Sequence, residues 1–75
     1  MTIDTVITAL GEIIGVPESD LSGDTPLTPE YDITSLDVAR LMIEIERIFD
    51  ITVHDEVVHT FGTAGDVARY VDSLI

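Results

Sequence analysis

The sequence predicts a small all-α protein: a four-helix bundle of three main helices and one short helix, with a long loop between helices one and two. Apolar residues recur at helical spacing in three separate stretches. Two of these stretches begin with a threonine that is followed three residues later by an aspartate, the spacing of a capping box. A segment with three prolines and no sustained period separates the first two stretches. Seventy-five residues suffice for one domain.

The first predicted helix ends where Gly15 and then Pro17 interrupt the pattern, and Thr2 can cap its start. Its apolar positions follow the helical period, which predicts one buried face. They are Ile3, Val6, Ile7, Leu10, Ile13 and Ile14.

The segment from Val16 to Ile33 is predicted to be a loop with one short helical turn near Glu18 to Leu21. Loops of this length are uncommon in compact domains and are usually functional or disordered. Four apolar residues are spaced along it as anchors, so we expect the loop to lie against the core. The anchors are Leu21, Leu27, Tyr31 and Ile33.

The second predicted helix begins at Thr34-Ser35-Leu36-Asp37 and ends near Asp50. At about 100° per residue, its apolar residues form two separate arcs. The broad arc is expected to face the core and contains Val38, Leu41, Met42, Ile45, Ile48 and Phe49. The second arc contains Leu36, Ala39 and Ile43, flanked by Asp37, Arg40, Glu44 and Arg47 on one side and by Ser35, Glu46 and Asp50 on the other. This arc is interpreted as a partner-docking patch, unless a neighbouring element covers it.

The remaining chain predicts two more helices. His54 to His59, after Ile51-Thr52-Val53, is expected to form a short third helix or turn. Thr63 with Asp66 starts the last helix, and its inward positions are expected to be Val67, Tyr70, Val71 and Leu74.

Composition narrows the function. The formal charge of −12 disfavours nucleic acid and anionic membranes, favours partners with basic patches, and predicts a fold that is sensitive to salt. The absence of cysteine excludes disulfides and thiolate metal sites. There is no signal-peptide pattern and no apolar run near the roughly 20 residues that span a bilayer. We therefore expect a soluble, cytoplasmic monomer.

Catalysis is not expected. A serine nucleophile needs a base within hydrogen-bond reach, and nothing in the spacing places His54 or His59 against Ser35. Two imidazoles five residues apart, with Asp55 and Glu56 between them, do not make a metal site either. Both histidines are interpreted as solvated.

Ser35 has a different potential use. If Thr34 and Asp37 cap the second helix, Ser35 occupies its first position with no structural role. A hydroxyl there lies near unpaired backbone N–H groups and the positive end of the helix dipole, which stabilise a phosphate. The pattern therefore indicates attachment of a phosphate-linked group, without specifying the group.

Ser35-Leu36-Asp37, followed by an amphipathic helix that ends in Ile48-Phe49-Asp50-Ile51-Thr52-Val53, resembles the carrier-protein family, which comprises acyl carrier proteins and their peptidyl carrier relatives. The resemblance spans nearly the whole chain, so residues 1–75 are expected to form one carrier domain. It implies that a phosphopantetheinyl transferase adds 4′-phosphopantetheine from coenzyme A to Ser35, and that the arm then holds cargo as a thioester.

The resemblance also implies partners: an acyl- or aminoacyl-loading ligase and downstream synthase or transferase enzymes. They would dock on the second helix, for which the expected contact residues are Leu36, Asp37, Ala39, Arg40, Ile43, Glu46 and Arg47.

Four positions depart from the family pattern. The family usually has Asp where this chain has Thr34, often has Gly where it has Asp32, and is typically acidic at Arg40 and Arg47. Helical spacing would let Arg40 pair with Asp37 and Glu44, and Arg47 pair with Glu44, so that this flank largely neutralises itself. We therefore expect an acyl carrier of a specialised fatty-acid or polyketide-type pathway. The alternatives are an aminoacyl or peptidyl carrier of a nonribosomal peptide pathway, and an unmodified acidic interaction module.

Overall fold

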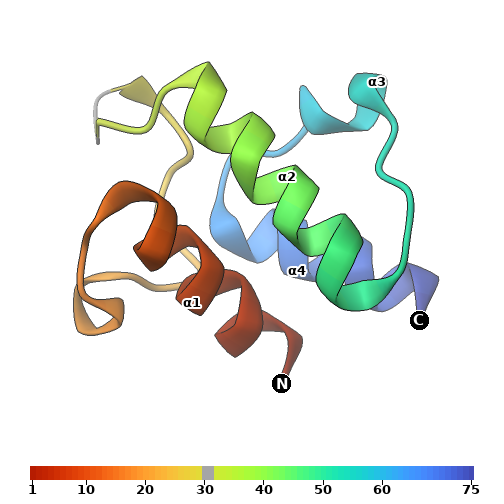
Figure 1. Cartoon of the computed structure of the whole chain (residues 1–75), viewed down its shortest axis with the longest axis horizontal. Helices are drawn as coiled ribbons and strands as arrows, with labels where there is room; N and C mark the ends of the chain where they lie inside the picture. The colour runs from red at the N-terminus through yellow and green to blue at the C-terminus, as the bar shows by residue number, and fades with distance from the viewer. Residues whose placement is uncertain (30–31) are drawn as a thin grey trace.

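The computed structural model describes residues 1–29 and 32–75, and it confirms the all-α fold within them. The main helices are α1 (Thr2–Ile14), α2 (Ser35–Phe49) and α4 (Ala64–Leu74), and the described residues contain no strand. The short α3 (Asp55–Val58) precedes α4, and a 3₁₀ turn, η1 (Glu18–Asp20), interrupts the loop after α1 as predicted. Figure 1 shows α2 running diagonally across the molecule, with α1 on one side and α3 on the other.

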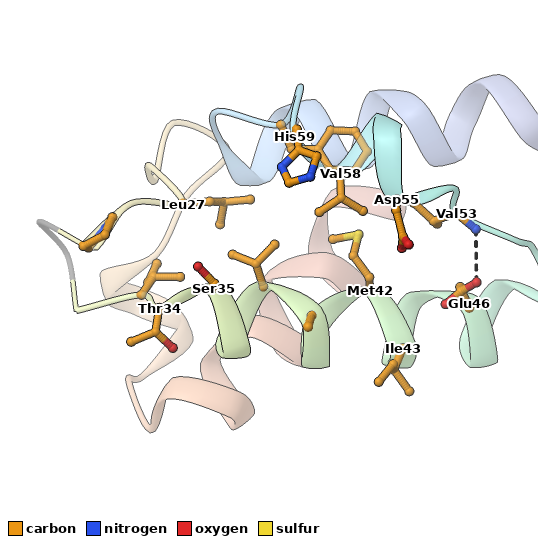
Figure 2. A pocket seen from close by; sticks show the side chains of 15 residues that line it. Leu27, Thr34, Ser35, Met42, Ile43, Glu46, Val53, Asp55, Val58 and His59 are labelled. Carbon is orange, nitrogen blue, oxygen red and sulfur yellow. Dashed lines mark hydrogen bonds between the residues drawn. The ribbon is translucent and has the colours of Figure 1, made fainter.

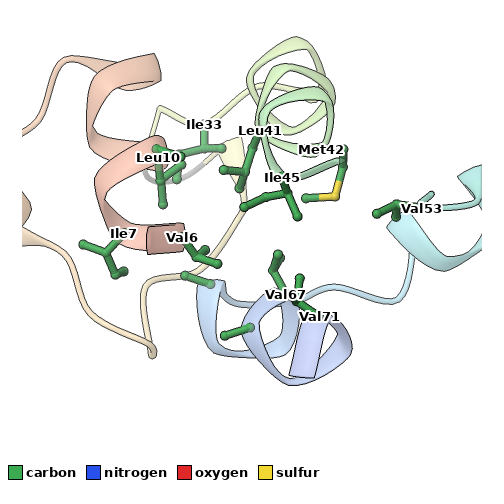
Figure 3. Close-up of a cluster of buried hydrophobic side chains, with 13 residues drawn as sticks. Val6, Ile7, Leu10, Ile33, Leu41, Met42, Ile45, Val53, Val67 and Val71 are labelled. Atoms are coloured by element: carbon green, nitrogen blue, oxygen red, sulfur yellow. The ribbon is translucent and has the colours of Figure 1, made fainter. Parts of the chain in front are cut away.

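The core lies between α1, α2 and α4 (Figure 3). α1 packs against both of the other main helices. Each large side chain removed from water here contributes roughly 1.5–3 kcal/mol, so this cluster holds α2 in place along its inner face. The largest fully buried side chains are Val6, Leu10, Ile33, Leu41, Ile45, Val67 and Val71.

The predicted end of the first helix is confirmed. Gly15 adopts a left-handed conformation with a φ of 71°, and its N–H donates to the Gly11 carbonyl over 2.9 Å. Glycine reaches this conformation without a steric penalty. The start of α4 is also confirmed: the Thr63 hydroxyl accepts from the Asp66 N–H, and the Asp66 carboxylate accepts from the Thr63 N–H.

The loop between α1 and α2 lies against the core as expected. Leu21 and Leu27 are half-buried on the core cluster, and Ile33 is 1% exposed. The fourth predicted anchor, Tyr31, lies outside the described residues.

Backbone hydrogen bonds fasten this loop to the start of α4. Ala64 donates to the Thr25 carbonyl over 3.1 Å, and Gly65 donates to the Gly23 carbonyl over 2.8 Å. A Cβ atom at Gly65 would lie only 2.9 Å from the Gly23 oxygen, so this approach requires a glycine. The loop is thereby a structural element with a defined path.

Three sequence-based expectations for individual residues are wrong. Thr2 does not cap α1: Met1 occupies that position, and the Thr2 hydroxyl donates to the Asp72 carboxylate of α4. Ile48 and Leu74, predicted to face inward, are 42% and 49% exposed. Both lie in the last turn of their helix, where the neighbouring helices cover side chains less, and Ile48 is also at the edge of its apolar arc.

Candidate functional site

The start of α2 presents Ser35 next to a complete capping box. The Thr34 hydroxyl accepts a hydrogen bond from the Asp37 N–H over 3.2 Å, and the Asp37 carboxylate accepts one from the Thr34 N–H over 3.0 Å. This confirms the predicted cap. Thr34 and Asp37 therefore satisfy two of the backbone N–H groups that a helix start leaves unpaired.

Ser35 is the first residue of α2, and its side chain is exposed. Within residues 1–29 and 32–75, its hydroxyl has no hydrogen-bond partner. Figure 2 shows this hydroxyl on the side of α2 that faces Leu27 and His59. An unengaged hydroxyl beside the positive end of a helix dipole suits a phosphate ester, because nearby backbone N–H groups favour negative charge. The residues present fit a phosphate-linked group at this position.

The second apolar arc of α2 is uncovered. Leu36 and Ile43 are 62% and 63% exposed, and Ala39 between them is exposed as well. The alternative that a neighbouring element covers this arc is therefore wrong for the described chain. Large side chains left in water on one helix face are a common feature of surfaces that bind a partner.

The charges beside this arc pair only in part. Arg47 donates to the Glu44 carboxylate over 2.8 Å, as predicted. This hydrogen bond first, and then the charge of Arg47, lowers the pKa of Glu44. The other two predicted pairs, Asp37–Arg40 and Arg40–Glu44, are wrong among the described residues, because the two carboxylates are engaged by the Thr34 N–H and by Arg47. Within residues 1–29 and 32–75, Arg40 therefore forms no ion pair, and its side chain lies on the exposed side of α2.

A cavity of about 610 Å³ opens next to Ser35, between α2 and the α3 region (Figure 2). Val38 and Met42 line it from α2, and Leu27, Val58 and Phe61 line it from the loop and the α3 side. Its volume lies within the roughly 300–1,000 Å³ typical of small-molecule sites, and its walls are mainly apolar. An apolar chain attached near Ser35 could be removed from water here.

Glu46 connects the two walls of this cavity. Its carboxylate accepts a hydrogen bond from the Val53 N–H over 3.1 Å, and both residues line the cavity. Val53 belongs to the segment that leads from α2 into α3, so the bond holds the α3 side at a set separation from α2. Glu46, predicted only as a docking residue, therefore also has a structural role.

Sequence reasoning missed the residues that the α3 side brings to the cavity. Asp55, Val58 and His59 all line it, although the sequence indicated only solvated or structural roles. A signal was present, because positions 55, 58 and 59 share one face of a helix. This spacing could not identify a cavity wall, because the sequence does not show which element α3 faces.

Among the described residues, the two histidines belong to no metal-binding cluster. His54 and His59 are both exposed, and the described residues hold no group of three His, Cys, Asp or Glu that could bind a metal ion. Among the helices described here, none combines the length and the hydropathy needed to cross a bilayer.

Comparisons with known proteins agree with this geometry. Residues 4–71 match the family described as "Phosphopantetheine attachment site". An acyl carrier protein of Acidothermus cellulolyticus is 29% identical over 72 residues, covering 91% of this chain and 86% of its own length. Acyl carrier proteins of Exiguobacterium sibiricum and of an Exiguobacterium species are 28% and 29% identical over 67 residues, each covering 89% of this chain and 85% of its own length.

Proposed function

Because this chain belongs to the phosphopantetheine-attachment family and its covalent cofactor is 4′-phosphopantetheine, we propose that Ser35 is the residue that carries it. The observation that supports this assignment is the unengaged, exposed Ser35 hydroxyl beside a capping box that other residues complete. On this proposal, residues 1–75 work as one carrier domain. The arm's thiol holds an acyl group as a thioester and delivers it to partner enzymes.

Loading is a group transfer in which Ser35 supplies the nucleophile. Its oxygen forms a bond to the phosphorus that bears the pantetheine arm in coenzyme A, and the adenosine bisphosphate portion leaves. The hydroxyl proton passes to a base on the phosphopantetheinyl transferase. The Thr34–Asp37 cap keeps the hydroxyl from being used as a helix cap, and the start of α2 favours the resulting phosphodiester charge.

The test is a change in mass. Incubating the apo-protein with coenzyme A and a broad-specificity transferase is expected to add roughly 340 Da, the mass of the arm. Ser35→Ala is expected to abolish the addition, whereas Ser19→Ala, at an exposed serine of η1, is expected to leave it intact. An unchanged mass with every transferase tried would instead support an unmodified acidic interaction module.

The arc of Leu36, Ala39 and Ile43, with its charged flanks, is the docking surface in this proposal. The phosphopantetheinyl transferase, a loading ligase and downstream synthase or transferase enzymes are its partners. Arg40 and Arg47 place positive charge where carriers of this family are typically acidic. A like charge at a docking site repels a partner whose surface is basic. We therefore assign the protein to a specialised fatty-acid or polyketide-type pathway.

Charge reversal tests this assignment. Arg40→Glu and Arg47→Glu are expected to improve kcat/KM with housekeeping fatty-acid synthase enzymes by roughly tenfold, and to weaken loading by the cognate ligase by a similar factor. Arg69→Glu makes the same change in net charge on α4 and serves as the control. Efficient elongation of the wild-type protein by the housekeeping enzymes would contradict a specialised role.

An aminoacyl or peptidyl carrier is the second candidate. Thr34 in place of the usual Asp is the observation that favours it. Mass spectrometry of the native, loaded protein distinguishes the two, because an amino acid and an acyl chain add different masses to the arm.

A further inference from the structure

We propose that the cavity beside Ser35 selects cargo by the charge at the far end of the chain: it admits uncharged acyl groups and excludes those that end in a carboxylate. Asp55 is the residue that sets this selection. The inference rests on the proposed function, because the cargo must be carried on Ser35 to reach the cavity.

The walls provide the attraction for an uncharged chain. Met42 from α2 faces Val53 and Val58 across the cavity (Figure 2), and Phe61 also lines it. Moving methylene groups from water into this space lowers the free energy in proportion to the apolar area removed from water. This attraction is the same for a neutral chain and for the methylene part of a carboxylated one.

The ionisable groups provide the discrimination. Glu46, Asp55 and His59 are the ionisable residues among the described ones that line the cavity. Glu46 is occupied by the Val53 N–H, whereas Asp55 has no hydrogen-bond or ion-pair partner among the described residues. Figure 2 shows the Asp55 side chain reaching from α3 toward α2, on the side of Met42 away from Ser35.

Among the described lining residues, no Lys or Arg side chain offsets the carboxylates of Glu46 and Asp55. The chain's three basic residues, Arg40, Arg47 and Arg69, are absent from the described cavity lining. A cargo carboxylate that entered would lose water against apolar walls and meet a like charge at Asp55. Both effects oppose the charged form. A chain of equal length that ends in a methyl group meets neither penalty.

Two cargoes of equal length test the proposal directly. The arm is loaded at Ser35 with octanoyl or octanedioyl groups from the corresponding coenzyme A thioesters, and mass spectrometry verifies the loading. Thioester cleavage by hydroxylamine is then compared with cleavage of the free acyl-pantetheines, at about pH 8 so that imidazoles are uncharged. Methyl NMR shifts of Met42, Val53 and Val58 report occupancy of the cavity.

We expect the protein to slow cleavage of the octanoyl thioester about tenfold more than cleavage of the octanedioyl thioester. The three methyl signals are expected to shift with octanoyl cargo only. Asp55→Asn is expected to raise the octanedioyl protection part of the way toward that of octanoyl, because it removes the like charge but leaves the loss of water against the apolar walls. Glu56→Gln removes one charge from the same short helix outside the cavity lining. It is expected to change the protection of neither the octanoyl nor the octanedioyl thioester.

Equal protection of both cargoes in the wild-type protein would overturn the proposal, as would protection of neither. An equal effect of Asp55→Asn and Glu56→Gln would show that net charge, not the cavity, sets the difference. These outcomes are distinct from failure of the proposed function, in which Ser35 takes up no arm and no thioester forms. The wild-type comparison needs no variant, so it holds even if Asp55→Asn alters folding.

Discussion

Thr34 and Ser35 divide two tasks that a single hydroxyl at a helix start could not perform together. The Thr34 hydroxyl is committed to the Asp37 N–H, so it contributes to the stability of α2. The Ser35 hydroxyl is left for a partner from outside. The departure from the family's usual Asp at position 34 therefore leaves the geometry of the attachment position intact, because both Thr and Asp can cap a helix.

Substitutions at Thr34 test this division. Thr34→Ala is expected to lower the free energy of unfolding by about 1 kcal/mol, because it removes the acceptor for the Asp37 N–H. Thr34→Asp is expected to stay within about 0.5 kcal/mol of wild type, since Asp is also a strong N-cap residue. Urea unfolding of the apo-protein measures both. Equal stability of Thr34→Ala and wild type would contradict the capping role.

Asp32 shows how a second departure is accommodated. Its φ is 60°, in the left-handed region that glycine enters without strain. Asp tolerates this conformation better than most residues, because its short side chain can hydrogen-bond locally.

Asp66 gives the start of α4 a defined pH dependence. Hydrogen bonds from the Gly62 and Thr63 N–H groups, with a smaller contribution from the charge of Arg69, lower the pKa of Asp66. Since the unfolded chain binds this proton more readily, the contribution to stability is fully present above about pH 4 and is lost as the pH falls through the lower, folded-state pKa.

Asp66→Asn isolates this effect, because it keeps an oxygen acceptor but does not titrate. The stability difference between wild type and Asp66→Asn is expected to be largest near neutral pH and to shrink below about pH 4. Urea unfolding across this range measures it. Asp20→Asn, at an exposed residue of η1, is the control and is expected to show no such narrowing. If the stability difference between wild type and Asp66→Asn stayed constant with pH, the proposed contribution of the ionised Asp66 carboxylate to stability would be contradicted.

At the scale of elements, α2 serves the core and the surface at once. Its inner face buries Leu41 and Ile45 completely, while its outer face leaves Leu36 and Ile43 in water. α1 packs against α2, the core cluster joins the inner face to residues of α4, and the capping box fixes where the helix begins. The start of α2, the proposed docking surface and one wall of the cavity are therefore parts of one helix.

The α3 side of the cavity depends on fewer contacts. α3 is four residues long and has no side-chain cap. It is tied to α2 through the Glu46–Val53 hydrogen bond and through packing of Val58 on the core. Elements with few buried contacts open more readily than the core does. The width of the cavity is thus expected to depend on Glu46.

Glu46→Ala tests this dependence. Loss of the acceptor is expected to cost about 1 kcal/mol and to speed hydrogen exchange at the Val53 amide by roughly tenfold. Glu46→Gln, which keeps an acceptor oxygen, is expected to restore most of the protection. NMR-detected exchange on the apo-protein measures this. Exchange at Val53 that does not change in Glu46→Ala would contradict the role of this bond.

At the scale of the whole molecule, charge repulsion opposes a compact fold. The net charge is −12, and the described residues contain three ion pairs, all on or near the surface. Surface pairs of this kind contribute little to stability. Three basic residues are too few to balance fifteen acidic ones. Repulsion between the acidic residues therefore destabilises the folded state, and dissolved salt screens this repulsion.

Salt should therefore stabilise the fold. Raising sodium chloride from about 10 mM to about 500 mM shortens the Debye length from roughly 30 Å to a few Å. We expect this to raise Tm by several degrees, about the effect of 1 kcal/mol in a domain of this size. Calorimetry measures the change. The double variant Glu12→Gln/Asp20→Asn, at two exposed acidic residues, is expected to show a smaller rise, and an unchanged wild-type Tm would contradict the expectation.

The sequence by itself determined the features that depend on neighbours along the chain. The two capping boxes, the left-handed Gly15 and the two arcs of α2 follow from residues within a few positions of one another, and the structure confirms them. Ser35 could be singled out for the same reason, because the cap and the candidate hydroxyl belong to one turn of helix.

The tertiary structure decided what depends on residues far apart in the chain. The cavity needs the loop, α2 and the α3 segment to meet, and the Glu46–Val53 bond joins two of them. The exposure of Ile48 and Leu74 depends on where the neighbouring helices stop, which no local pattern reports. Local hydrogen-bonding rules identify where a helix starts, but only packing between distant segments determines which residues share a cavity.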